Sequence, residues 1–436
     1  MQAFRFWLQL GFVSFGGPAG QIAMMHAELV ERRRWISERR FLHALNYCML
    51  LPGPEAQQLA TYIGWLMHRS WGGIVAGMLF VLPSWFILVG LSWVYVAYGH
   101  LAVVAGIFYG IKPAVTALVL HAAWRIGTRA LRDRWLWMVA ALAFVAIFAL
   151  ALPFPAIVLA AGVIGHLGGR WRPELFTTGG AHGASASGHG PALIDDATPT
   201  PAHARFSRAG FIRIVAGGVG LWVAAMALLW SFGGWQHALV QMGWFFSKAA
   251  LLTFGGAYAV LPYVYQGAVE HHHWLTAAQM IDGLALGETT PGPLIMVVAF
   301  VGFVGGESLQ VLGAQHPFLG GALAAGVVTF FTFLPSFVFI LAGGPLIEST
   351  HGQLRFTAPL TVITAAVVGV ILNLALFFAY HVLWPKGFGQ GFDAVSAAIA
   401  LAAAVALFRF RLGVMPLLAI CALAGLAFSA LRLAAA

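Results

Sequence analysis

Long apolar stretches joined by short loops are the feature that most restricts what this chain can fold into. A membrane-spanning helix needs about 20 predominantly apolar residues. Nine stretches approach or exceed that length: 72–99, 101–123, 135–152, 154–168, 211–232, 318–345, 358–383, 393–408 and 412–432. With 61% of the residues hydrophobic and only 8% charged, too little polar surface remains to cover a water-soluble globule. The sequence therefore predicts an all-α, polytopic helical bundle in a lipid bilayer.

The formal net charge of +9 does not point to a nucleic-acid partner. The arginines lie in short loops between apolar stretches, where basic residues mark the cytoplasmic side of a membrane protein. Cys48 and Cys421 lie inside apolar stretches and make neither a disulfide framework nor a metal set. We expect no nucleic acid, metal or cofactor to bind. The apolar start of the chain recurs around 246–254, so we interpret it as mature structure and not as a signal peptide.

Two groups of motifs recur at a constant spacing of 239 residues. The segment S-F-G-G-P at 14–18 returns as T-F-G-G-A at 253–257, and P-G-P at 52–54 returns at 291–293. Trp35 and Trp274 keep the same register. Farther along, after an insertion, L-P-S at 82–84 matches L-P-S at 334–336. One register held over some forty residues indicates that the chain is a duplication.

The charges of equivalent loops indicate that the two repeats are inverted. The first-half loop reads E-R-R-R-W-I-S-E-R-R at 31–40, whereas its counterpart reads E-H-H-H-W-L-T-A-A-Q at 270–279, without lysine or arginine. The positive-inside rule places the first loop in the cytoplasm and the second outside. The stretch 211–232 has no first-half counterpart and supplies the extra crossing that the inversion requires.

These observations predict three regions. Residues 1–168 form the first membrane repeat, and 169–210 form a flexible cytoplasmic linker rich in small and polar residues. Residues 211–436 form the second membrane repeat, with the extra helix at 211–232 and the repeat proper from about 243.

The recurring glycine and proline motifs predict helices that are broken or re-entrant inside the membrane. Unpaired backbone groups are costly in hydrocarbon unless they line a cavity or are buried in protein. Proline suits the first turn of a helix, so Pro18, Pro54 and Pro293 are each predicted to open a half-helix. Free N–H groups at such ends bind anions, and interrupted segments in matching places of inverted halves indicate a transporter site. The alternative is that these residues only kink helices or allow close packing.

Two glutamates lie beside the Pro-Gly-Pro motifs. Glu55 follows the first motif directly, and Glu288 precedes the second by three residues. A carboxylate beside an anion-attracting helix end opposes an anion when ionised and admits it when protonated, which suggests proton coupling. The alternative is that each glutamate caps a half-helix or pairs with a cation.

Other polar residues near the motifs complete the predicted site. Lys112 and Lys248 are the cations nearest the apolar interior, and each is a candidate anion ligand or partner of a glutamate, unless it extends to the membrane interface. Gln57, Gln58, Thr61, Thr289 and Thr290 are candidate neutral donors to an oxyanion, or polar contacts between helices. The predicted substrate-binding and translocation residues are Gly16, Gly17, Pro18, Pro52, Gly53, Pro54, Glu55, Gln58, Lys112, Lys248, Gly255, Gly256, Glu288, Thr289, Thr290, Pro291, Gly292 and Pro293.

The motifs resemble those of the chromate ion transporter family in its long, two-domain form. The matching pieces are F-G-G-P-A-G-Q-I-A-M-M-H at 15–26, L-P-G-P-E-A-Q-Q-L-A-T-Y-I-G-W at 51–65, T-F-G-G-A-Y-A-V-L-P at 253–262 and E-T-T-P-G-P-L-I-M-V at 288–297. The resemblance covers both halves and excludes only the linker. Ala257 stands where the first half has Pro18, so the two breaks are not equivalent.

The resemblance implies efflux of chromate across the bacterial inner membrane, driven by the proton gradient or by anion exchange, with chromate resistance as the phenotype. Sulfate is a related dianion, and a permease for sulfate or another oxyanion is the alternative function. An enzyme is not expected, because no protease, hydrolase, ATPase, dinucleotide or haem motif is present. The expected partners are a tetrahedral oxyanion, protons and the lipid bilayer, and a homodimer is a compatible assembly.

Overall fold

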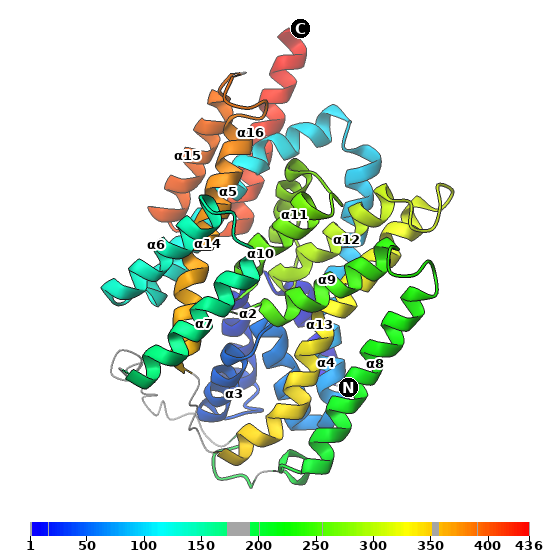
Figure 1. Cartoon of the computed structure of the whole chain (residues 1–436), viewed down its shortest axis with the longest axis vertical. Helices are drawn as coiled ribbons and strands as arrows, with labels where there is room; N and C mark the ends of the chain where they lie inside the picture. Colours follow the sequence, from blue (N-terminus) through cyan, green and yellow to red (C-terminus); the bar gives the residue numbers. More distant parts are fainter. Residues whose placement is uncertain are drawn as a thin grey trace.

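The computed structural model describes residues 2–15, 17–171, 192–199, 201–254, 256–350, 357–389 and 391–435. These residues form helices and connecting turns, with one isolated β-bridge between Ile36 and Ile194. The predicted all-α membrane bundle is confirmed (Figure 1). Much of the predicted linker, residues 172–191 and 200, lies outside the described residues.

Equivalent elements of the two repeats follow one another in the same order. The first repeat contains α1 (Gln2–Val13), α2 (Gly17–His26), a π-helical turn η1 (Ala27–Arg32), α3 (Glu38–Leu50), α4 (Glu55–Tyr98), α5 (Ala102–Ala130), α6 (Arg134–Phe148) and α7 (Phe154–Trp171). After a short 3₁₀ turn, η3 (Ala202–Ala204), the helix α8 (Arg208–Trp230) precedes the second repeat. That repeat contains α9 (Ala238–Leu252), α10 (Ala257–Tyr265), η4 (Gln266–His271), α11 (Ala277–Thr289), η5 (Leu294–Met296), α12 (Val297–Ser308), α13 (Pro317–Thr350), α14 (Thr357–Leu383), α15 (Ala394–Phe408) and α16 (Val414–Ala435).

The repeat extends to unusual local structure. The π-helical turns η1 and η4 occupy equivalent positions, and α11 has the same length and register as α3. Figure 1 shows α3 towards one end of the long axis and α11 towards the other, as two inverted repeats require.

The Pro-Gly-Pro segments form hairpins that turn back inside the protein. Helix α3 has 13 residues and so is about 20 Å long at 1.5 Å per residue, which is shorter than a hydrocarbon core of about 30 Å. After Pro-Gly-Pro, α4 begins at Glu55 and reverses at His68 and Arg69, where the backbone leaves the helical region. A Cβ added to Gly64 would lie 2.5 Å from the carbonyl oxygen of Gly72, so the two arms of α4 are in contact. In the second repeat a loop at 309–316 makes the same reversal between α12 and α13.

Six helices in the described part of the chain are long and apolar enough to cross a membrane: α4, α5, α8, α13, α14 and α16. Three further predicted spans form helices that are shorter than these six. The stretches 135–152, 154–168 and 393–408 form α6, α7 and α15, of 15, 18 and 15 residues. Helix α6 ends at Phe148, before the predicted end at 152, because a turn with Ala151 at positive φ follows it. Helix α7 extends beyond the predicted 168 to Trp171, and α15 ends at the predicted residue, Phe408. Helix α8 lies along one edge of the molecule (Figure 1) and leaves most of its apolar surface exposed, as a lipid-facing helix would.

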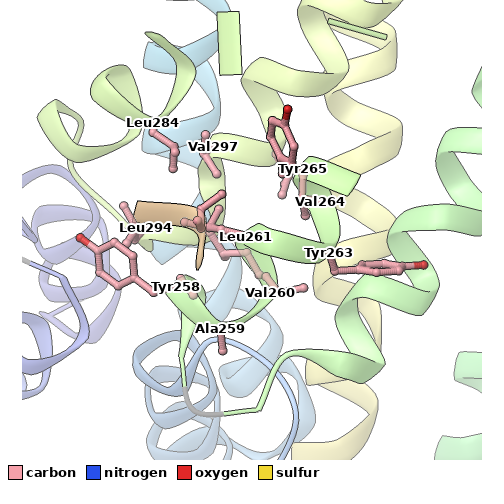
Figure 2. Packing of buried hydrophobic residues seen from close by; sticks show 14 of the residues in the cluster. Tyr258, Ala259, Val260, Leu261, Tyr263, Val264, Tyr265, Leu284, Leu294 and Val297 are labelled. Atoms are coloured by element: carbon pink, nitrogen blue, oxygen red, sulfur yellow. The ribbon is translucent and has the colours of Figure 1, made fainter. Parts of the chain in front are cut away.

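The centre of the second repeat is a closely packed apolar core. Helix α10 lies against the α11–α12 hairpin, and every residue from 291 to 300 is buried. Figure 2 shows Leu261 of α10 beside Leu294, with Leu284 and Val297 next to them, while Tyr258 projects away. This core holds the second Pro-Gly-Pro segment in place.

Part of the predicted linker is docked on the first repeat. The amide of Ile194 donates to the carbonyl of Trp35 at 3.0 Å, and the hydroxyl of Ser37 donates to Asp196 at 2.5 Å. A ring nitrogen of His203 lies 3.1 Å from the carbonyl oxygen of Trp65. Residues 192–199 are therefore held against the 31–40 loop, because buried Ile194 and these hydrogen bonds fix them.

Candidate functional site

The helix breaks of the two repeats are joined by reciprocal backbone hydrogen bonds. The amide of Gly53 donates to the carbonyl of Thr253 at 2.7 Å, and the amide of Gly292 donates to the carbonyl of Ser14 at 2.9 Å. Both glycines have positive φ, +130° and +103°, which L side chains rarely adopt. Each Pro-Gly-Pro segment thus closes on the Gly-Gly break of the other repeat, as a two-fold arrangement requires.

The Leu-Pro-Ser motifs close on the same segments. A Cβ added to Gly53 would lie 2.4 Å from Ser336 Oγ, and one added to Gly292 would lie 2.7 Å from Ser84 Cβ. Both serines are buried. All three repeated motifs therefore meet across the interface between the repeats, where Ser14, Gly53 and Thr253 are buried and Pro18, Pro52 and Glu55 are partly buried.

Two glutamines of the first repeat hold the breaks together. Gln21 Nε2 donates to the carbonyls of Ser14 at 3.1 Å and Gly292 at 2.6 Å. Gln58 Nε2 donates to the carbonyl of Pro52 at 2.8 Å. The second repeat has valines, Val260 and Val297, at the equivalent positions, so these polar contacts occur at one of the two related places.

The first turns after the two Pro-Gly-Pro segments differ in polarity. In the first repeat Gln57, Gln58 and Thr61 are fully buried. The equivalent residues of the second repeat are Met296, Val297 and Phe300. The polar turn directly after Pro-Gly-Pro is therefore confined to the first repeat, although both repeats have the same backbone arrangement.

Several buried polar atoms near the breaks have no partner among the described residues: Ser14 Oγ, Gln21 Oε1, Gln57 Oε1, Gln58 Oε1 and Ser84 Oγ. An unsatisfied buried polar group costs about 1–3 kcal/mol, and native structures contain few of them. Gln21 Nε2 and Gln58 Nε2 donate to backbone carbonyls, which fixes the orientation of both amides, so their unpaired atoms are acceptor oxygens. Gln57 and Gln58 thus have unused hydrogen-bonding capacity at the start of α4, whereas Ser14, Gln21 and Ser84 have it beside Gly292.

The two predicted glutamates have different surroundings. Glu55 is the first residue of α4 and is half-buried, with no hydrogen bond or ion pair to the described part of the chain. Glu288 accepts a hydrogen bond from the hydroxyl of Tyr258. Their equivalents in the other repeat are Leu294 and Met49. Of these two glutamates, Glu55 is the one that has no partner among the described residues and lies at a helix N-terminus.

The glycines and prolines of the predicted site lie at the starts of the helices after the breaks. Gly17 and Pro18 begin α2, and Gly256 is the residue before α10. Pro54 directly precedes α4, and Pro293 precedes the 3₁₀ turn that leads into α12. Pro52 and Pro291 lie on the other side of Gly53 and Gly292 in the same turns. Gly16 and Gly255 lie outside the described residues.

Thr289 and Thr290 bond to their own helix. The hydroxyl of Thr289 donates to the carbonyl of Leu286 at 3.0 Å, and that of Thr290 donates to the carbonyl of Gly287 at 3.1 Å. These bonds occupy the hydroxyl protons that the sequence suggested for an oxyanion.

The structure places the two predicted lysines away from the breaks. Lys248 is exposed on α9, with Nζ 5.7 Å from the ring centre of Trp244, and it lines a cavity of about 740 Å³ with Glu270 and His272. Lys112 lies in α5, with Nζ 3.1 Å from Oδ2 of Asp282. Neither cavity lined by these lysines includes a Pro-Gly-Pro residue.

The sequence reasoning missed four kinds of residue at these places. Gln21 lies in the motif at 15–26, and Ser84 and Ser336 lie in the two Leu-Pro-Ser motifs. The residues that they contact across the interface cannot be predicted from the spacing of these motifs. Asp282 had a usable signal, because an acid within a membrane segment is functional by default. Tyr258 had none.

Comparison with known proteins gives a consistent assignment. The family model described as chromate transporter matches residues 1–166 and 240–426. A chromate transport protein of Pseudomonas aeruginosa is 34% identical over 85% of this chain and 79% of its own length. One from Cupriavidus metallidurans is 31% identical over 94% of this chain and 88% of its own length.

A shorter relative matches part of the chain. An uncharacterised transporter of Bacillus subtilis is 30% identical over 32% of this chain, which covers 71% of that protein. No solved structure matches the chain. Since the family model covers both repeats and most of the sequence, this chain belongs to the chromate transporter family.

Proposed function

We propose that the protein is a secondary active transporter that exports chromate from the cytoplasm across the bacterial inner membrane. The observation that carries the proposal is the polar, buried and partly unpartnered cluster at the start of α4, where helix N–H groups are also available. The names of the curated relatives support chromate as the substrate.

A tetrahedral dianion matches the chemistry of this cluster. Helix N-termini concentrate N–H donors and carry a partial positive charge. The amide groups of Gln57 and Gln58 supply further donors without a fixed countercharge. Such a site recognises the shape and charge of an oxyanion, and sulfate shares both with chromate.

Glu55 gives the site a protonatable gate. An ionised carboxylate at the start of α4 repels a dianion, whereas the neutral acid accommodates it. We therefore assign Glu55 the admission of the anion, which makes its affinity depend on pH.

The reciprocal bonds between the breaks support alternating access. The two repeats meet at Gly53 with Thr253 and at Gly292 with Ser14, so a movement of one repeat against the other opens the cluster on one side and closes it on the other. The basic loop at 31–40 and the linker at 169–210 are assigned to the cytoplasm by the positive-inside rule. A homodimer is compatible with this arrangement.

Uptake into everted membrane vesicles tests the proposal. Wild-type vesicles with an imposed pH gradient are expected to accumulate chromate, and sulfate is expected to compete. Glu55→Gln should remove the pH dependence of KM, while Glu31→Gln, which changes an exposed carboxylate of η1, should retain it. A wild type that carries sulfate but not chromate would identify an oxyanion permease instead. If KM of the Glu55→Gln variant depends on pH as in the wild type, Glu55 does not control the admission of the anion.

A further inference from the structure

A second polar cavity, of about 650 Å³, lies at the end of the molecule that carries the 270–279 loop. It lies between the C-terminal end of α4, the start of α5, α11, the end of α12, and the segment from α14 to α15. Its titratable and charged lining residues are Tyr95, His100, Tyr109, Lys112, Asp282, Glu307, His381 and Asp393. Three carboxylates against one lysine make this cavity attractive to cations and unfavourable for a dianion.

Asp282 is the buried carboxylate of this cavity, and one of its two oxygen atoms has no hydrogen-bond partner among the described residues. It is 2% exposed, and its Oδ2 accepts a hydrogen bond from Tyr95 at 2.8 Å and lies 3.1 Å from Lys112 Nζ. Its Oδ1 is buried and has no partner among the described residues. A proton can therefore be added at Oδ1 without displacing either neighbour of Oδ2.

The other two acids of the cavity have different roles. Asp393 caps α15, accepting from the amides of Val395 and Ser396 and from the hydroxyl of Tyr109. Glu307 is half-buried near the end of α12. Neither combines deep burial with an unpartnered oxygen.

We infer that Asp282 carries the coupling proton, taken from this cavity, with Lys112 as its counter-ion. The inference rests on the proposed function, because it names the driving ion of the same transport. A proton moves from hydronium in the cavity to Oδ1, and the pair changes from carboxylate and ammonium to carboxylic acid and ammonium. The pair gains one positive charge, and the attraction of Lys112 for Asp282 is lost.

The position of Asp282 connects this proton to the anion site. Helix α11 belongs to the second repeat and ends at the Pro-Gly-Pro segment, whereas Tyr95 and Lys112 belong to the first. The ion pair therefore ties α11 to the other repeat. Protonation weakens this ion pair. Helix α11 and the turn after it, which contains Gly292, can then move relative to the first repeat. Glu55 and Asp282 have separate roles: one admits the anion, and the other takes the proton.

Proteoliposomes containing the full chain separate these roles. In Asp282→Asn, chromate-for-chromate exchange is expected within about twofold of wild type, since the side chain keeps its shape. Accumulation driven by an imposed pH gradient should fall at least tenfold, together with the proton flux reported by an internal pH dye. Glu307→Gln, in the same cavity, should keep both activities. Gradient-driven accumulation and proton flux retained in Asp282→Asn would overturn the inference.

Carbodiimide labelling of the wild type provides a measurement that does not depend on the folding of a variant. The reagent modifies protonated carboxyl groups in apolar surroundings, and peptide mass spectrometry locates the product. Labelling at Asp282 should increase as pH falls. Absence of label at Asp282 over the whole pH range in which gradient-driven transport occurs would contradict the inference. Absence of any anion exchange by the wild type would instead reject the proposed function, and labelling would still report whether Asp282 takes up a proton.

Discussion

The amide nitrogen of Gly53 lies 2.7 Å from the carbonyl oxygen of Thr253. The contact joins the first Pro-Gly-Pro segment to the second Gly-Gly break, and Gly292 with Ser14 repeats it at 2.9 Å. Each repeat thereby satisfies a backbone donor of the other. This matters in a membrane protein, because no water is available in hydrocarbon to replace a lost partner.

Gly53→Ala should destabilise the protein by about 2 kcal/mol, from positive-φ strain alone. The new Cβ would also lie 2.4 Å from Ser336 Oγ. Thermal unfolding in detergent measures the effect. Gly90→Ala in α4 is the matched control, since nothing lies within 4 Å of its Cβ, and equal melting temperatures for the two variants would contradict the packing described.

Gln21→Val introduces the residue found at the equivalent place in the second repeat. The carbonyls of Ser14 and Gly292 lose their side-chain donor, so we expect a loss of about 1–3 kcal/mol in the free energy of unfolding. The same substitution at the exposed Gln9 of α1 should have little effect. Unfolding curves of both variants in the same detergent provide the comparison. A Gln21→Val protein as stable as wild type would show that the two hydrogen bonds of Gln21 do not contribute to stability.

Gln57→Met likewise exchanges a polar residue for its second-repeat equivalent, with little change in volume. If the buried amide contacts the transported anion, kcat/KM for chromate should fall about tenfold, which corresponds to about 1.4 kcal/mol. Initial rates in vesicles, normalised to folded protein, measure this. Gln9→Val serves again as the control, and unchanged transport in Gln57→Met would place the anion elsewhere.

Acid should destabilise the region around His272. Burial, followed by the nearby positive charges of His271, Lys248 and His273, lowers the pKa of His272 to about 4 from an ordinary value of 6.5. The folded state therefore binds fewer protons than the unfolded state between these values. Stability contributed by the neutral ring is complete above about pH 6.5 and decreases as pH falls towards about 4.

His272→Phe tests this dependence. A phenyl ring can keep the stacking on Trp274, whose ring centre is 4.4 Å away, but it does not titrate. The melting temperature of the variant should decrease less than that of wild type from pH 6.5 to 4. His316→Phe, in the exposed loop before α13, should follow the wild type. An equal decrease in all three proteins would exclude His272 as the source.

The sequence by itself determined the class of the molecule and its internal repeat. Apolar length requires a bilayer, and only helices with internally satisfied backbone groups meet that requirement in such stretches. The constant spacing between Gly53 and Gly292 identified the duplication and the positions of the breaks. These properties are local or periodic, so they can be read along the chain.

Only the tertiary structure decided which residues meet. Gly53 with Ser336, Gln21 with Gly292 and Lys112 with Asp282 are separated by well over a hundred residues, and their contacts depend on how two repeats pack. For the same reason the structure, and not the spacing, separated Lys112 and Lys248 from the breaks. The end of α6 at Phe148 also escaped prediction, because apolar residues continue through the turn that follows it. Hydropathy determines where a chain enters the membrane, whereas packing and pairing of buried polar groups determine which side chains share a site.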